Sequence, residues 1–216
     1  MSFYNNKKPS AMDELKKRVK ENSLGGVYLF WGAEEYTKDF YADKLRKLAK
    51  DSPLPEFNYE IFDAETRTVG DFEEATFALP YLWENRVIEI RNLKPKQVTQ
   101  SDAEEYARIF ETLPDYLTVL ILLRAGEYGG SKGGSDSAKD DSNDENKPEE
   151  KKNGFKTFLK AVEESGLSVE FEPEKGDKLC NWVARHFTSR GAKTEPGLPS
   201  FLTSYCGTDM YTLQGE

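Results

Sequence analysis

The sequence contains few of the residues on which most enzymatic chemistry depends. Its 216 residues include only two cysteines, Cys180 and Cys206, and one histidine, His186. One histidine excludes a histidine-rich metal site, and two cysteines fit reduced thiols better than a disulfide scaffold. Cys180 and His186 are six residues apart in a predicted helix and do not share a face, so they are a poor nucleophile pair. We therefore expect structural roles for all three residues, and no metal or cofactor.

Long apolar runs and an excess of positive charge are also missing. The longest apolar run, LTVLILL at residues 117–123, is far shorter than the roughly 20 residues that span a bilayer. The opening MSFYNNKKPS has no apolar signal-peptide region. The net charge is −9, whereas contacts to nucleic-acid phosphates need clustered Lys and Arg. We therefore predict a cytoplasmic protein without a membrane partner, whose binding is not dominated by nucleic acid.

Hydrophobic residues make up 37% of the chain, which is enough for a packed core, and their spacing alternates between strand-like and helix-like. The predicted strands are residues 27–31, 57–62, 86–90, 117–123 and 167–171. The predicted helices between and before them are residues 11–21, 34–50, 70–79, 101–112 and 155–165. The strand at 117–123 is apolar throughout, which is typical of a strand covered on both faces in a parallel sheet. The alternation predicts an α/β fold with a parallel sheet flanked by helices.

Two further segments differ from this pattern. Residues 127–152 consist largely of Gly, Ser, Asp, Asn, Glu and Lys, and we predict a disordered surface insertion, with an acidic interaction segment as the alternative. After Pro173 the strand patterns stop, and helical patterns follow at 179–187, at 198–205 and after Thr208 or Asp209 as N-cap. We therefore expect an α/β domain over residues 1–172 and part of a small, all-helical lid domain over 173–216. The last helix is short, which suggests that this second domain is truncated.

A loop between the first strand and its helix stands where a phosphate loop would be expected. Such a loop follows the pattern GxxxxGK[ST], whose backbone N–H groups surround the phosphates. Here the loop is too short and lacks GK[ST]; it comprises Gly32, Ala33, Glu34, Glu35, Tyr36, Thr37 and Lys38. Its two glutamates stabilise the helix N-terminus by about 0.3–1 kcal/mol each and repel phosphate. No predicted strand ends in acidic residues that would hold magnesium, and we expect Glu89 to point outward from its strand. Nucleotide hydrolysis is therefore not expected.

An apolar turn is predicted between the helix at 70–79 and the strand at 86–90. We expect Leu79 to share the buried side of that helix and Pro80 to end it. Tyr81, Leu82 and Trp83 follow. Because turns are usually polar, an exposed Leu–Trp pair indicates an interaction site, where full burial would contribute roughly 2–3 kcal/mol for each side chain. The alternative is that these side chains fold back onto the domain's own core.

Several segments resemble, in order and spacing, the delta subunit of the bacterial DNA polymerase III clamp loader. They are VYLFWGAEEY, FNYEIFDAE, ALPYLWENRVIEIRNL, SGLSVEFEP and the G-x-D pattern at Gly207 and Asp209, and they cover nearly the whole chain outside 127–152. The resemblance implies an AAA+-like fold that has lost its ATPase site. It also implies that an apolar pair enters a pocket on the ring-shaped sliding clamp (the beta subunit) and opens the ring. In this chain the pair is Leu82 and Trp83, flanked by Tyr81 and Arg86.

The resemblance has further implications for partners and chemistry. Other clamp-loader subunits would bind through a C-terminal domain absent from this chain, and DNA would be contacted indirectly through the assembly. The subunit itself would have no catalysis, although its family is part of the DNA polymerase III holoenzyme, a DNA-directed DNA polymerase and nucleotidyltransferase. Ring opening would follow from differential binding to the open and closed rings.

Three other functions remain open from the sequence. The first is an NTPase or kinase with a degenerate phosphate loop, against which the missing loop lysine argues. The second is a scaffold that recognises no clamp. The third is a DNA-binding adaptor using a dispersed basic set, Lys178, Arg185, Arg190 and Lys193.

Overall fold

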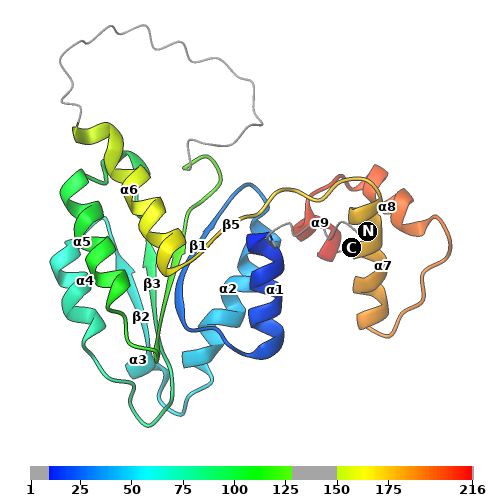
Figure 1. The fold of residues 1–216 in the computed structure, drawn as a ribbon. Coiled ribbons are helices and arrows are strands. Elements are labelled where there is room, and N and C mark those ends of the chain that lie inside the picture. The colour runs from blue at the N-terminus through cyan, green and yellow to red at the C-terminus, as the bar shows by residue number, and fades with distance from the viewer. Residues whose placement is uncertain (1–9, 128–149, 216) are drawn as a thin grey trace, which may run out of the picture.

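The computed structural model describes residues 10–127 and 150–215 (Figure 1). In these residues a five-stranded sheet is entirely parallel, with strand order β2-β3-β4-β1-β5. The strands are β1 (Gly26–Trp31), β2 (Tyr59–Asp63), β3 (Arg86–Arg91), β4 (Leu117–Leu122) and β5 (Gly166–Glu170). The predicted α/β fold with a helix-flanked parallel sheet is confirmed.

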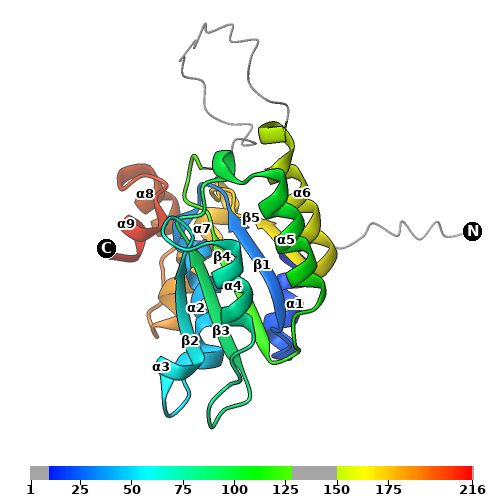
Figure 2. The same ribbon diagram turned by 90° about the vertical axis from the view of Figure 1, so that its left-hand side faces the viewer.

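Helices cover both faces of the sheet (Figures 1 and 2). One face is covered by α4 (Val69–Thr76), α5 (Gln100–Glu111) and α6 (Glu150–Ser165), and the other by α1 (Ala11–Glu21) and α2 (Glu35–Lys50). Two short elements, α3 (Pro55–Asn58) and η1 (Pro95–Gln97), lie in connections. The predicted strand at 57–62 therefore starts late, because Pro55, whose φ is already helical, opens a helical turn before it.

The alternation of side chains along each strand builds two cores. Val27 and Leu29 of β1 belong to the cluster under α4, α5 and α6, whereas Tyr28 and Phe30 belong to the cluster under α1 and α2. All four are fully buried. This is the period of two expected when successive Cβ atoms point to opposite faces, and it explains why the strand reads as a continuous apolar run.

The remaining helices follow the sheet and share a buried cluster of their own. They are α7 (Asp177–Ser189), α8 (Leu198–Tyr205) and α9 (Met210–Gly215). The cluster contains Leu179, Val183, Met210 and Leu213, and Tyr36 of α2 packs against it. Asp209 is the N-cap of α9, accepting a hydrogen bond from the N–H of Thr212 at 2.9 Å. The division into two domains near residue 172 remains a prediction, and most of the predicted insertion at 127–152 lies outside the described residues.

The position expected for Glu89 is wrong. Its side chain is fully buried in β3 and does not point to solvent. Arg46 donates to it at 2.7 and 2.9 Å, Arg91 at 2.7 Å and the hydroxyl of Tyr59 at 2.5 Å. A lone polar residue in a strand is normally solvated, but here hydrogen-bond donors on α2, β2 and β3 together compensate for its burial.

Candidate protein-binding surface

The loop after β1 is closed by contacts with its own chain. Gly32 has φ +113°, and a Cβ added to it would lie 2.4 Å from the carbonyl oxygen of Phe171. The N–H of Glu34 donates to the same oxygen at 2.9 Å. The loop therefore packs on the residue after β5. The N–H groups of Glu34 and Tyr36 already donate within the chain and are not available to a phosphate.

The ammonium group of Lys38 lies between the carboxyl ends of β1 and β4, the edge at which open parallel sheets usually bind ligands. It donates to the carbonyl oxygens of Gly32 at 3.0 Å and Leu123 at 2.8 Å, and to Glu35 at 2.8 Å. The side chain is almost completely buried. Lys38 would have to break these three hydrogen bonds to meet a phosphate, so its charge already has partners within the chain.

The start of α2 is occupied by side chains in the same way. Glu34 caps the helix by accepting from the N–H of Tyr36 at 3.2 Å. Burial raises the pKa of the Glu34 carboxyl, with repulsion from Asp209 and Glu174 in the same direction, and the hydrogen bonds from backbone N–H groups oppose the increase. An anion placed here would meet a carboxylate and not a free helix N-terminus.

An aromatic cluster joins α2 to the C-terminal helices beside this loop. The ring of Tyr36 meets the rings of Trp182 and Tyr211 edge-on, at centroid distances of 5.2 and 5.3 Å. The hydroxyl of Tyr211 donates to Asp39, and the Oγ1 of Thr37 lies 3.6 Å from the sulfur of Met210. The helices α7 and α9 are thus attached to the N-terminal end of α2 by protein contacts alone.

The cysteine and histidine side chains are not brought together. The sulfur of Cys180 lies 3.7 Å from the hydroxyl oxygens of Ser200 and Thr203, whereas His186 stacks on Trp182 at a centroid distance of 5.1 Å. Within residues 10–127 and 150–215, no three His, Cys, Asp or Glu residues are grouped so that they could hold a metal ion. The helices in those residues are also too short or too polar to cross a membrane.

The turn between α4 and β3, residues 77–85 (the α4–β3 turn), projects from the opposite end of the sheet, where the strands begin (Figure 1). The helix α4 ends at Thr76, so the expectation of a helix reaching residue 79 is wrong. Carbonyl oxygens at the C-terminal end of α4 accept hydrogen bonds from nearby side chains. Arg86 donates to that of Ala75 at 2.6 Å, and the hydroxyl of Thr76 donates to that of Glu73 at 2.6 Å. The burial expected for Leu79 is also wrong: the chain leaves the helix before Leu79 can share its buried side.

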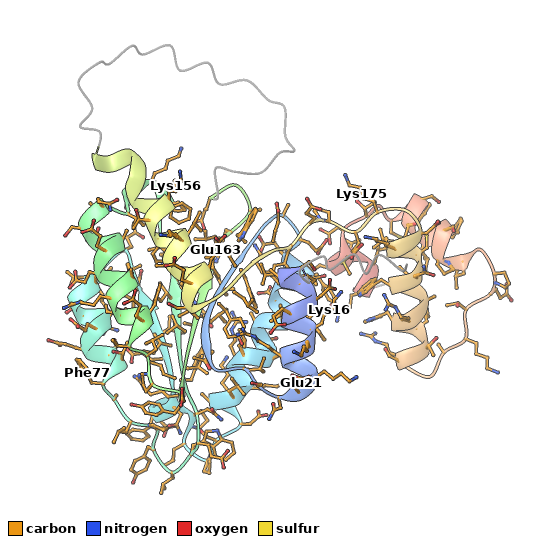
Figure 3. The ribbon with its side chains drawn as sticks, in the orientation of Figure 1. Lys16, Glu21, Phe77, Lys156, Glu163 and Lys175 are labelled. Carbon is orange, nitrogen blue, oxygen red and sulfur yellow. The ribbon has the colours of Figure 1, made fainter. Side chains whose placement is uncertain are left out.

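Large apolar side chains of this turn are open to solvent. Phe77, Leu79 and Leu82 are each 72% exposed, Tyr81 is 50% exposed, and Trp83 is 39% exposed. Figure 3 shows Phe77 directed outward from the end of α4. Exposed apolar side chains concentrated in one turn are typical of an interaction surface.

The two residues of the predicted apolar pair differ in their surroundings. Leu82 has φ +50°, a left-handed conformation that is uncommon for a large side chain and that tends to cluster at functional sites. The indole N–H of Trp83 donates to the carbonyl oxygen of Leu48, which anchors that ring to the end of α2. Trp83 is thus partly folded back onto its own domain, as in the alternative interpretation, whereas Leu82 is not.

Arg86 lies behind this surface and is not part of it. Its side chain is buried and donates to Glu60 at 2.5 Å as well as to the end of α4. Glu60 also accepts from Arg67 at 2.7 Å. Arg86 therefore links β3 to the end of α4 at the base of the α4–β3 turn, and its contact with a partner remains a prediction.

The comparisons with known proteins agree with the sequence resemblance. A family model described as DNA polymerase III, delta subunit, matches residues 28–132, which include both the loop after β1 and the α4–β3 turn. This segment, just under half of the chain, matches the DNA polymerase III delta-subunit family. No curated protein matches the chain.

The fold of this delta-type chain is similar to that of the Bacillus subtilis DNA clamp loader delta protein YqeN. The TM-score is 0.62 at 14% identity, and the match covers 94% of this chain and 54% of that one, so the chain spans about half the length of that protein. A gamma subunit-related DNA polymerase III protein from Thermotoga maritima matches with a TM-score of 0.47 at 13% identity, covering 80% of this chain and 50% of the other.

Part of the exposed surface of the delta-type chain could not be predicted from the sequence. Phe57, on α3, is exposed, and its ring lies 5.2 Å from that of Tyr81. The exposure of Phe77 is not predictable either, because its position within a helical pattern gives no sign that the helix ends at Thr76. A phenylalanine in FNYEIF reads as the first residue of a strand, and only the fold brings it to the turn.

Proposed function

We propose that this delta-type chain binds the sliding DNA clamp through the apolar side chains of the α4–β3 turn and thereby favours the open ring, without hydrolysing nucleotide. The observation that carries the proposal is the group of exposed residues in that turn, above all Leu82 in its left-handed conformation. The match to the delta-subunit family suggests the sliding clamp as the partner of this surface. The proposal places the protein in the cytoplasm, within the replication machinery.

The energetics of the turn suit a binding role. Burying an apolar side chain completely is worth about 1.5–3 kcal/mol, and Leu82 is 72% exposed, so about 1–2 kcal/mol is available from this residue on binding. Leu79 and Phe77 offer similar amounts. Trp83 offers less because its ring already rests on α2. Only affinity that differs between the open and the closed ring shifts the ring's equilibrium, so tight binding to both would open nothing.

The loop after β1 supports the absence of ATP chemistry in this chain. A nucleotide phosphate would have to displace the ammonium group of Lys38 from the carbonyl oxygens of Gly32 and Leu123, and would then lie beside the carboxylate of Glu34. Other subunits of the loader would therefore supply nucleotide hydrolysis and expose or hide the turn.

The test is binding of the chain to the sliding clamp of the same organism, by surface plasmon resonance in the absence of nucleotide. We expect the Leu82→Ala/Trp83→Ala variant to bind at least about a hundredfold more weakly, or about 3 kcal/mol. A matched control is Phe201→Ala/Tyr205→Ala, which removes another exposed aromatic pair, on α8. This control should bind as the wild type does.

Two outcomes would contradict the proposal. In the first, the wild type does not bind the clamp. In the second, the Leu82→Ala/Trp83→Ala variant is folded by circular dichroism and binds the clamp as well as the control does. A single Trp83→Phe variant tests the hydrogen bond to Leu48, since it removes the indole N–H and keeps an aromatic ring, although a smaller one.

A further inference from the structure

Asn58 makes a two-way hydrogen-bonded contact with the backbone of the α4–β3 turn. It is the last residue of α3, and its side chain is fully buried. Its Nδ2 donates to the carbonyl oxygen of Tyr81 at 3.0 Å, and its Oδ1 accepts from the N–H of Tyr81 at 2.7 Å. The side-chain amide thus pairs with Tyr81 as the backbone of a neighbouring strand residue would.

Asparagine suits this contact better than aspartate or an aliphatic residue would. Aspartate could accept from the N–H of Tyr81, but its carboxylate would repel the Tyr81 carbonyl oxygen. An aliphatic residue would leave both backbone groups without this partner. The Nδ2 of Asn58 also donates to Ser52 at 3.1 Å, and a third, longer contact reaches the carbonyl oxygen of Leu54 at 3.4 Å. Asn58 therefore links the segment before β2 to the α4–β3 turn, 23 residues away in the sequence.

The contact between Asn58 and Tyr81 lies directly before Leu82, whose backbone conformation is strained. Leu82 follows Tyr81 and has φ +50°, a conformation that a leucine adopts only where its surroundings impose it. The ring of Phe57, beside Asn58, also packs against the ring of Tyr81. Figure 2 shows α3 and the α4–β3 turn together at one end of the sheet.

We propose that Asn58 is a positioning residue for clamp binding, which holds Tyr81 and Leu82 in the arrangement that the partner recognises. This inference rests on the proposed function. If the turn adopts its binding conformation for only a fraction of the time, the apparent dissociation constant for the clamp rises by the reciprocal of that fraction. Asn58 raises that fraction without touching the clamp.

The first measurement needs no variant. Hydrogen exchange of the Tyr81 amide in the wild-type chain should be slowed at least about a hundredfold relative to an unstructured peptide, because the N–H is bonded to a buried acceptor. Exchange at the unprotected rate would overturn the proposal, whatever the clamp does.

The second measurement compares Asn58→Ala and Asn58→Asp with Ser52→Ala. The Ser52→Ala control removes one partner of Asn58 and leaves its pair with Tyr81 intact. We expect both Asn58 variants to be folded by circular dichroism, to exchange faster over residues 79–83, and to bind the clamp at least about tenfold more weakly. Ser52→Ala should remain within about threefold of the wild type. Folded Asn58 variants with wild-type exchange, or with wild-type clamp affinity, would overturn the proposal.

A third comparison separates positioning from general stabilisation and from failure of the proposed function. If Asn58 acts through Leu82, the effect of Asn58→Ala on clamp affinity should be smaller in a Leu82→Ala background than in the wild type, because the two residues are coupled. An equal effect in both backgrounds would refute action through Leu82. If the wild type does not bind the clamp, the proposed function fails, while hydrogen exchange still decides whether Asn58 holds the turn.

Discussion

Replacing Glu89 by glutamine is expected to destabilise the domain strongly, although the side chain keeps its size, because the change removes a buried charge and turns one acceptor oxygen into an NH2 donor. The buried carboxylate of Glu89 accepts two hydrogen bonds from Arg46, one from Arg91 and one from Tyr59. Burial by itself would raise the pKa of Glu89, but these hydrogen bonds and the charge of Arg46 outweigh it and lower the pKa to about 2. The charged form is therefore the one that the fold stabilises.

The magnitude follows from the difference between the folded and unfolded pKa values. The unfolded value is 4.5 and the folded value is about 2. At about 1.36 kcal/mol for each unit, the charged form of Glu89 contributes about 3 kcal/mol to the free energy of unfolding at pH 7. Because the folded pKa is the lower one, this contribution is complete above pH 4.5 and is lost as the pH falls toward 2. At pH 3 less than half of it should remain.

The assay is urea denaturation followed by far-UV circular dichroism. We expect Glu89→Gln to lose about 3 kcal/mol at pH 7, and the gap to the wild type to narrow between pH 4.5 and pH 3. The control is Glu65→Gln, which breaks an exposed ion pair with Lys94 and should change the stability by less than about 1 kcal/mol. A loss below about 1 kcal/mol at pH 7 in Glu89→Gln, or a gap that does not change with pH, would refute the reasoning.

Two further predictions concern the α4–β3 turn and the start of α2. Leu82→Gly should be more stable than Leu82→Ala by about 0.5–1 kcal/mol, the reverse of the usual order, because glycine adopts φ +50° without strain; thermal denaturation of the pair would check this, and a more stable alanine variant would contradict it. Tyr36→Ala removes ring contacts with Trp182 and Tyr211 worth about 0.5–1.5 kcal/mol each. We expect faster proteolytic cleavage in residues 172–176 and a larger radius of gyration by small-angle X-ray scattering, and unchanged values of both would show that this cluster does not hold the C-terminal helices.

Much of the fold could be predicted because it depends on local patterns. The apolar run at 117–123 indicates a strand covered on both faces, and β4 occupies residues 117–122. The helix at 198–205 was predicted with its observed bounds. The loop after β1 lacks GK[ST], which is enough to argue against a phosphate loop before any coordinate is known. These features follow from side-chain spacing, helix capping and the chemistry required of a motif, all of which act within a few residues.

Local patterns were therefore enough to predict the secondary-structure elements, the fold class and an apolar turn as a candidate interaction surface. Which polar side chains are buried and which apolar ones are exposed depends on the tertiary structure. Glu89 is buried because Arg46 and Tyr59 reach it from other elements. Asn58 holds a turn 23 residues away, and Leu79 is exposed because the helix before it stops early. The burial of a side chain depends on which residues the fold places around it. Contacts between distant segments produce no periodic pattern in the sequence, so they could not be predicted from it.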